Sequence, residues 1–230
     1  MTSPALRTAN LTKIYSGGPA LLDASLAILP GEFVAVLGPS GSGKSTLFRC
    51  ITRLTEPDAG EVFIGDKALH NLQGEALAKA RKDIGVVFQQ FNLIRRRTAL
   101  ENVLAGRLGS APLWRVATDM FSPADIALAS DALDAVGLSN KRHQRADTLS
   151  GGQQQRVAIA RALAQQSHVL LADEPVASLD PESAASVLTL MQSLTRTNGL
   201  AILCTLHQPQ YAQAYADRTL HMREGRIVSG

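Results

Sequence analysis

Cysteine is scarce in this sequence, with only Cys50 and Cys204 among 230 residues. The two lie far apart, and each sits in an apolar stretch. The sequence therefore predicts neither a disulfide framework nor a cysteine-based metal cluster. We expect a reducing, cytosolic setting.

Long apolar runs are also missing. No run approaches the roughly 18 residues that a membrane-spanning helix needs. The first seven residues, MTSPALR, contain no basic segment followed by an apolar one, as a secretory signal would. If the protein acts at a membrane, we expect another subunit to form the pore.

Charge shows no strong excess of one sign. The formal net charge is +3, and the basic residues are spread along the chain apart from the short run Arg95, Arg96 and Arg97. This pattern does not indicate a nucleic-acid surface, so we expect no nucleic-acid partner. Internal repeats and low-complexity segments are absent, and a hydrophobic content of 45% is enough for one sizeable core.

Short apolar runs are present, and they predict the fold class. Four runs rich in β-branched or aromatic residues read as buried parallel strands of an α/β sheet: residues 33–37, 84–88, 169–172 and 201–206. Residues 8–15 and 22–28 mix polar and apolar side chains. These two segments predict a half-exposed antiparallel sheet that leans on the main one.

The middle of the chain has a different character. Helical patterns dominate, for instance at residues 100–108, 124–136 and 153–164. We therefore expect a helical subdomain at about residues 90–165, inserted into a core formed by about residues 1–89 and 166–230. Residues 109–121, with Pro112 and Trp114, are the least predictable part of this region.

A phosphate-binding loop is predicted directly after the apolar run 33–37. Residues 38–45 read GPSGSGKS, which fits G-x-x-x-x-G-K-[ST] between a strand and a helix-compatible stretch through Leu54. Glycines let backbone N–H groups turn toward the phosphates at a helix N-terminus. Lys44 is expected to reach the β- and γ-phosphates, and Ser45 to bind Mg²⁺. The candidate ATP-binding residues here are Gly38, Pro39, Ser40, Gly41, Ser42, Gly43, Lys44, Ser45 and Thr46.

Two carboxylates follow another apolar run. Asp173 and Glu174 come at the end of the strand predicted at residues 169–172, where ligands bind in open α/β sheets. Asp173 is suited to hold Mg²⁺, and Glu174 to polarise the attacking water. Taken alone, an apolar strand that ends in two carboxylates is equally consistent with a solvated surface and with a catalytic site. Together with the phosphate loop, it predicts nucleotide hydrolysis.

The segment Leu149-Ser150-Gly151-Gly152-Gln153 precedes a helix expected to begin near Gln154. A serine and two glycines at a helix N-terminus form an anion site. This segment matches the LSGGQ signature, and the chain here resembles the ATP-binding cassette (ABC) family. The resemblance covers nearly the whole chain and implies a P-loop NTPase (RecA-like) core with an antiparallel β subdomain and an inserted α-helical subdomain.

Other motifs match the family in its usual order. Tyr15 resembles the aromatic residue that stacks on adenine. Gln89 resembles the glutamine that contacts Mg²⁺ and the attacking water, with Gln90 as a neighbouring competitor. Asp180, in Ser178-Leu179-Asp180, resembles the loop at the dimer interface, and His207 resembles the histidine that contacts the γ-phosphate.

The resemblance also implies partners. Two copies are expected to pair head to tail, so that residues 150–153 of one chain close on the ATP held by Lys44 of the other. A free-standing importer ATPase is favoured, because the chain has neither the coiled coil of repair cassettes, nor the second cassette of translation proteins, nor the fused spanning helices of exporters. We therefore expect permease subunits and a substrate-binding protein as partners, and a peripheral position on the cytoplasmic face of the inner membrane.

Within the importers, local segments resemble the ATPase of phosphonate transporters. They are residues 100–109 followed by Trp114 and Arg115, residues 172–182, and residues 205–208. Phosphite or another oxyanion stays open as cargo. Arg53 stands where the family commonly has glycine, and it is not expected to affect the chemistry. Because the sequence ends at Gly230, we expect no regulatory domain. The permease is expected to dock near residues 89–97, and the three arginines there are either part of that contact or a solvated face.

Overall fold

A six-stranded sheet forms the centre of the molecule in the computed structural model, which describes residues 3–110 and 121–228. The strand order is β10-β9-β3-β8-β7-β6, and only β10 runs antiparallel to its neighbour. The strands are β3 (Phe33–Leu37), β6 (Ile84–Val87), β7 (Val169–Asp173), β8 (Ala201–Thr205), β9 (Arg218–Arg223) and β10 (Arg226–Val228).

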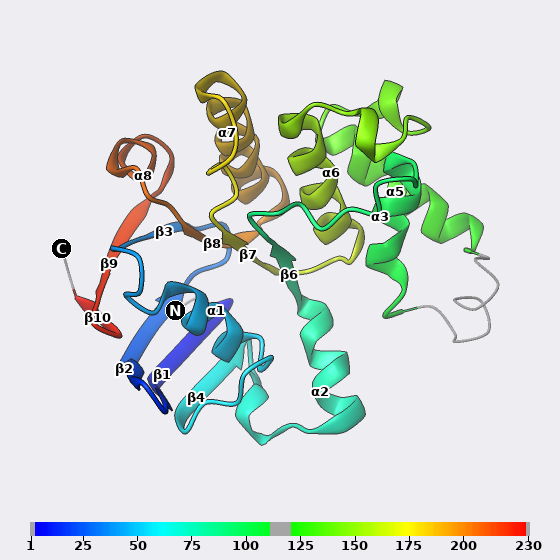
Figure 1. Ribbon diagram of the computed structural model, residues 1–230. Coiled ribbons are helices and arrows are strands. Elements are labelled where there is room, and N and C mark those ends of the chain that lie inside the picture. Colours follow the sequence, from blue (N-terminus) through cyan, green and yellow to red (C-terminus); the bar gives the residue numbers. More distant parts are fainter. Residues whose placement is uncertain (1–2, 111–120, 229–230) are drawn as a thin grey trace.

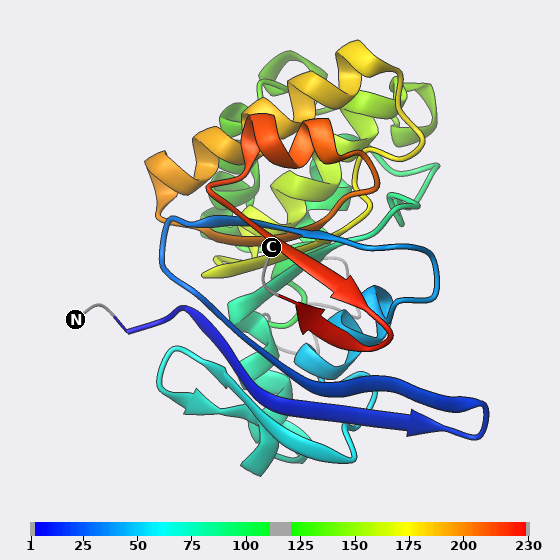
Figure 2. The same ribbon diagram turned by 90° about the vertical axis from the view of Figure 1, so that its left-hand side faces the viewer.

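A second sheet is antiparallel and has the order β2-β1-β4-β5. Its strands are β1 (Leu6–Tyr15), β2 (Gly18–Ile28), β4 (Ala59–Ile64) and β5 (Lys67–Ala68). Figures 1 and 2 show this sheet on one side of the central sheet, with α1 (Lys44–Ile51) between the two. Helix α2 (Gly74–Ala80) contributes Leu77 and Ala80 to the same apolar layer.

The central strands bury both faces, because successive side chains of a strand point to opposite sides. In β3, Val34 and Val36 pack toward α1 and the second sheet, whereas Phe33, Ala35 and Leu37 pack into a separate cluster on the other face. Strands β7 and β8 alternate in the same way. The continuous apolar runs in the sequence therefore reflect a sheet that is covered on both sides.

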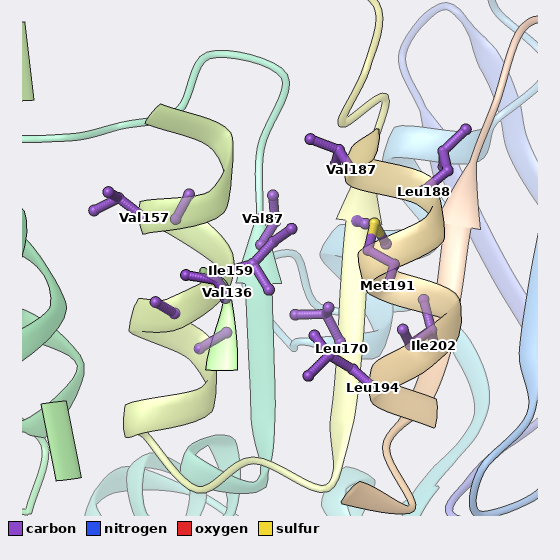
Figure 3. Close-up of a cluster of buried hydrophobic side chains, with 14 of the residues drawn as sticks. Val87, Val136, Val157, Ile159, Leu170, Val187, Leu188, Met191, Leu194 and Ile202 are labelled. Carbon is purple, nitrogen blue, oxygen red and sulfur yellow. The ribbon is translucent and has the colours of Figure 1, made fainter. Parts of the chain in front are cut away.

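Five helices within residues 3–110 and 121–228 join the apolar cluster on the second face. They are α3 (Ala99–Leu104), α5 (Pro123–Ala135), α6 (Gly151–Ala164), α7 (Pro181–Asn198) and α8 (Pro209–Tyr215). Figure 3 shows side chains of α6 and α7 meeting Val87, Leu170 and Ile202 of the strands beneath them. Side-chain caps fix where four of these helices begin: Thr98 before α3, Ser122 before α5, Ser150 before α6 and Asp180 before α7.

The predicted α/β architecture is confirmed, with small errors at element ends. Helix α6 begins at Gly151 rather than near Gln154, because Ser150 and Gln153 form a capping box. Helix α3 ends at Leu104 and passes into a 3₁₀ turn at Ala105–Arg107, so the predicted helix 100–108 was too long. The stretch after the phosphate loop is helical only to Ile51, because Arg53 adopts φ +55°.

The predicted boundaries near residues 90 and 165 stay a prediction. Helices α3, α5 and α6 gather at one end of the molecule (Figure 1), yet their apolar residues belong to the same cluster as those of α7 and the core strands. Most of the segment 109–121 lies outside the described residues. None of the helices within residues 3–110 and 121–228 is long and apolar enough to cross a membrane.

Candidate nucleotide-binding site

Predicted site residues that follow four of the strands converge at the carboxyl edge of the central sheet. Strands β3, β8, β7 and β6 are adjacent and parallel, so their ends meet there. Val36, Thr205 and Asp173 are level with one another in the register. The residues that follow these strand ends are Gly38 after β3, His207 after β8, Glu174 after β7 and Gln89 after β6. Parallel α/β sheets bind ligands at this edge.

The phosphate loop joins β3 to α1, and Lys44 folds back over it. The Lys44 ammonium donates hydrogen bonds to the carbonyl oxygens of Gly38 at 2.7 Å and Pro39 at 3.1 Å. An ammonium has three donors, so one N–H is left without a partner in the described part of the chain. The Ser42 hydroxyl is buried and also finds no partner among the described residues. Both groups are free to bind an anion at the N-terminus of α1.

Two glycines of the loop permit close backbone approach. A Cβ on Gly43 would lie 2.3 Å from the carbonyl oxygen of Ala20, and the residue has φ +105°. A Cβ on Gly38 would lie 2.3 Å from the carbonyl oxygen of Met222. The remaining predicted loop residues lie on its outer side or in the first helical turn: Pro39, Ser40, Gly41 and Ser45 are exposed, and Thr46 is half-buried.

Tyr15 lies in the hairpin that packs against this loop. It ends β1 and pairs with Gly18 of β2, only two residues before Ala20. Since Ala20 contacts Gly43, the hairpin and the phosphate loop are direct neighbours. The Tyr15 side chain is 43% exposed and is therefore accessible to a ligand.

A hydroxyl of β8 bonds both acidic residues after β7, one through its carboxylate and the other through its backbone N–H. Thr205 Oγ1 donates to Asp173 Oδ1 at 2.8 Å and accepts from the Glu174 N–H at 2.8 Å. Glu174 has φ +50°, a left-handed conformation that is unfavourable for a residue other than glycine. Its Oε1 lies 2.6 Å from His207 Nε2. The structure thus brings Asp173, Glu174 and His207 together as one cluster.

Gln89 follows β6 and borders a cleft of about 410 Å³. The cleft is lined by Gln89, Gln90, Phe91, Asn92, Leu93, Arg95, Ala146, Asp147, Gln154 and Ser178. The segment after Gln89 is bound to the helical region. Arg161 of α6 donates to the carbonyl oxygens of Asn92 at 2.7 Å and Phe91 at 3.2 Å, and buried Asn102 of α3 bonds both backbone groups of Ile94.

The signature residues lie at the start of α6. Ser150 Oγ accepts from the Gln153 N–H at 3.3 Å, and the Gln153 side chain accepts from the Ser150 N–H at 3.1 Å. Gly151 and Gly152 pack closely against Leu179 and Ser183 of the same chain. Helix α6 packs on one face of the central sheet and α1 on the other, and no hydrogen bond or ion pair joins residues 38–46 to residues 150–153.

Asp180 has a local structural role. Its carboxylate caps α7 by accepting from the Ser183 N–H at 2.9 Å. This backbone hydrogen bond lowers the pKa of Asp180. It also fixes where α7 begins, directly after the segment that contacts Gly151.

Sequence reasoning missed Thr205, Arg161 and Asn102. Thr205 and Arg161 act on residues that are distant in sequence, so no contiguous motif marks them. Asn102 bonds Ile94, eight residues earlier, across a loop that shows no motif. A weak signal exists for Thr205, since it is the polar residue at the end of an apolar strand beside the predicted histidine.

The residues of the phosphate loop and the acidic pair fit a nucleoside triphosphate and Mg²⁺. The buried Lys44 and Ser42 each have an unused donor at a helix N-terminus, which suits phosphate. Asp173 and Ser45 supply a carboxylate and a hydroxyl, oxygen donors of the kind that Mg²⁺ prefers, and α1 contacts β7.

Comparisons with known proteins agree with this geometry. The sequence model of the ABC transporter family matches residues 21–177, more than half of the chain. The chain is 49% identical over 229 residues to the phosphonates import ATP-binding protein PhnC of Stutzerimonas stutzeri, covering 97% of this chain and 83% of that one. It is 45% identical to the hypophosphite import ATP-binding protein HtxD of the same organism, covering 99% and 67%.

Solved structures show the same fold. Two dimeric structures of the ABC transporter cassette MJ0796 superpose with TM-scores of 0.82 and 0.80 at 36% identity, covering 97% of each chain. The second of them is a post-hydrolysis state bound to ADP and Pi. The predicted P-loop NTPase fold is confirmed by this agreement. By its sequence, its fold and the order of its motifs, this chain belongs to the ABC transporter family.

Proposed function

We propose that this chain is the ATP-hydrolysing subunit of an importer for phosphonates, bound peripherally to the cytoplasmic face of the inner membrane. The observation that carries the catalytic part is the convergence of the phosphate loop, Asp173, Glu174 and His207 at the ends of three adjacent parallel strands. The relatives' names, which describe import ATP-binding proteins, support the transport part.

The phosphate loop binds the triphosphate. Lys44 directs its free N–H to the β- and γ-phosphates, while the N–H groups of the first turn of α1 and the Ser42 hydroxyl surround them. Ser45, Asp173 and Gln89 would hold Mg²⁺, which would neutralise charge on the phosphate oxygens. Tyr15 stacks on the adenine ring.

Glu174 orients the attacking water and accepts its proton. Its left-handed backbone and the hydrogen bond from its N–H to Thr205 fix where the carboxylate points. His207, 2.6 Å from that carboxylate, holds the side chain and contacts the γ-phosphate. Water activation therefore depends on two neighbouring strand ends, those of β7 and β8.

The signature of a second copy completes each site. Within one chain, residues 150–153 belong to the helix on the opposite face of the sheet from α1, which supports their acting on the nucleotide of a partner. Ser150, Gly151, Gly152 and Gln153 of one chain then close on the γ-phosphate bound by the other, with Asp180 in the loop between the copies. The dimeric structures of MJ0796 support this arrangement.

Permease subunits dock in the cleft beside Gln89. The segment that lines this cleft is tied to α3 and α6 by Asn102 and Arg161, so a force applied there reaches the signature helix. Arg95 and Arg96 present exposed charges at this place, whereas Arg97 bonds Glu101 at 2.7 Å. A substrate-binding protein delivers cargo on the other side of the membrane.

Hydrolysis by purified variants tests the catalytic part. Glu174→Gln retains ATP binding and loses hydrolysis by at least about 100-fold, because the amide cannot accept the proton. Lys44→Ala is expected to lose both ATP binding and ATP hydrolysis. Glu75→Gln is the matched control, since Glu75 is an exposed acidic residue without an ion pair among the described residues. Hydrolysis by Glu174→Gln at the unchanged rate would refute the assignment.

Growth tests the cargo. A strain deleted for this chain is expected to grow on inorganic phosphate and to fail on a phosphonate as the sole phosphorus source. The same strain is also grown on hypophosphite as the sole phosphorus source, because the similarity to HtxD favours hypophosphite as an alternative cargo. Normal growth on phosphonate with failure on hypophosphite would replace the cargo assignment and leave the ATPase assignment intact.

A further inference from the structure

The end of β1 that carries Tyr15 extends beyond its neighbour β4. The pairing of β1 with β4 stops at Thr12 and Ala59, and the pairing with β2 is irregular on both sides of Lys13. A strand end that has lost a backbone partner is free to shift, unless a side chain replaces that partner. The tyrosine proposed to stack on adenine therefore needs another support.

Asp58 supplies that support. Its N–H donates to the Thr12 carbonyl oxygen at 2.9 Å, and its carboxylate Oδ2 accepts from the Ile14 N–H at 2.6 Å. The side chain thus continues the ladder by one more hydrogen bond after β4 has ended. The backbone that leads into Tyr15 is fixed at both Thr12 and Ile14.

The second carboxylate oxygen of Asp58 fixes Lys13. The Lys13 ammonium lies 2.8 Å from Asp58 Oδ1, and its side chain is only 15% exposed. The shared hydrogen bond raises the pKa of Lys13, and together with the Ile14 N–H it lowers the pKa of Asp58, so both groups are charged. The ion pair therefore holds the ammonium in one place.

Lys13 in turn lies over the Tyr15 ring, with its Nζ 5.6 Å from the ring centroid. A cation at this distance is attracted to the face of an aromatic ring. It occupies one face, while Tyr15 is 43% exposed overall. The opposite face is then the one that can stack on a planar base.

We infer that Asp58 is a positioning residue for the nucleobase: through Lys13 and the Ile14 N–H, its carboxylate fixes Tyr15 so that one ring face meets adenine. This role rests on the proposed ATP-binding function. It assigns Asp58 to the base and not to the phosphates, which are bound by the separate loop at residues 38–45.

Paired titrations with Mg²⁺-ATP and with inorganic tripolyphosphate test the inference, because only ATP has a base. Tyr15→Ala is expected to weaken ATP binding about tenfold, the size of one lost stacking contact. Asp58→Ala is expected to weaken it about three- to tenfold and to leave tripolyphosphate binding unchanged. Asp58→Asn keeps an acceptor for the Ile14 N–H and loses the ion pair. Its affinity for ATP should therefore lie between that of the unchanged protein and that of Asp58→Ala.

Asp66→Ala is the matched control. Asp66 is an exposed aspartate in the turn after β4, and its carboxylate makes no hydrogen bond or ion pair with the described residues. The double variant Tyr15→Ala, Asp58→Ala should bind ATP no more weakly than Tyr15→Ala alone, since both changes act through the same contact.

Three results would overturn the inference: unchanged ATP binding by Asp58→Ala, equal weakening of both ligands, or additive losses in the double variant. The proposed function itself would fail in a different way. In that case Lys44→Ala and Tyr15→Ala would also bind ATP like the unchanged protein.

Discussion

At the scale of single residues, Thr205 links the two acidic residues of the candidate site. It is fully buried, and its hydroxyl is the shared partner of the Asp173 carboxylate and the Glu174 N–H. Removing the hydroxyl leaves the Glu174 N–H without its acceptor and frees the Asp173 carboxylate and the Glu174 backbone to shift. Activity and stability therefore depend on the same atom.

Thr205→Val tests this role, because valine has nearly the same shape and no hydroxyl. Hydrolysis is expected to slow by about 10- to 100-fold, the effect of a small misplacement of catalytic groups. The free energy of unfolding is expected to fall by about 1–3 kcal/mol. Thr205→Ser keeps the hydroxyl and should retain most activity. Equal activity of the valine and serine variants would contradict the account.

Arg53 also gains its explanation at this scale. It takes a left-handed conformation at the end of α1, where the family commonly has glycine. Its buried guanidinium compensates by pairing with Glu56 and by donating to the carbonyl oxygen of Leu69. We therefore expect the departure from glycine to affect stability and not the chemistry.

Two substitutions separate strain from contacts at Arg53. Arg53→Ala loses the guanidinium contacts and keeps the strained backbone, whereas Arg53→Gly loses the contacts and relieves the strain. The glycine variant should be more stable than the alanine variant by about 1 kcal/mol in chemical denaturation. An alanine variant as stable as the glycine variant would show that the conformation carries no strain.

Much of the candidate site could be predicted from the sequence, because its main parts are contiguous. The loop around Lys44, the pair Asp173 and Glu174, and the signature at residues 150–153 each form a short local pattern. Asp58 and Thr205 could not be found in this way. Their partners lie 44 and 31 residues away in the chain, and only the strand pairing brings them together.

At the scale of elements, side-chain caps decide where the helices on one face begin. Glu101 in the capping box of α3 accepts from the Thr98 N–H at 2.7 Å and from Arg97 at 2.7 Å. These two hydrogen bonds lower the pKa of Glu101, with the Thr98 N–H as the larger cause. The Glu101 carboxylate therefore stabilises the fold fully at pH values above its pKa in the unfolded chain. This stabilisation is lost as the pH falls through its lower pKa in the folded protein.

Glu101→Gln tests this pH dependence, since glutamine keeps the acceptor and removes the charge. At pH 7 the unchanged protein should have the higher Tm. The difference should shrink as the pH falls from about 4.3, the ordinary pKa of a glutamate, through the lower pKa of the folded protein, because only below that lower pKa is the carboxyl neutral in both states. A Tm difference that is the same at pH 7 and pH 3 would contradict the prediction.

The elements that could be predicted are those with strong local signals. Strand β3 is buried at all five positions, and its apolar run is continuous. Strands β4 and β9 were missed, since only alternate positions are buried: Val62 and Ile64 in β4, Leu220 and Met222 in β9. Their existence depends on pairing with β1 and β3, which is information outside the local segment.

At the scale of the whole molecule, the two anion-binding helix starts belong to different faces of the sheet. Helix α1 packs against the antiparallel sheet, and α6 packs with α7 and the other helices on the opposite face (Figure 1). In the proposed head-to-tail dimer, both helix starts would act on one nucleotide. We propose that ATP links the two copies and that its hydrolysis opens the dimer.

The most direct test of this account is the mass in solution of the Glu174→Gln variant, measured by light scattering with and without ATP. We predict a monomer without nucleotide and a dimer with it, because bound ATP is not hydrolysed. Adding Lys44→Ala should keep the protein monomeric in both conditions. A Glu174→Gln protein that stays monomeric with ATP, or is dimeric without it, would contradict the proposal that ATP joins two copies.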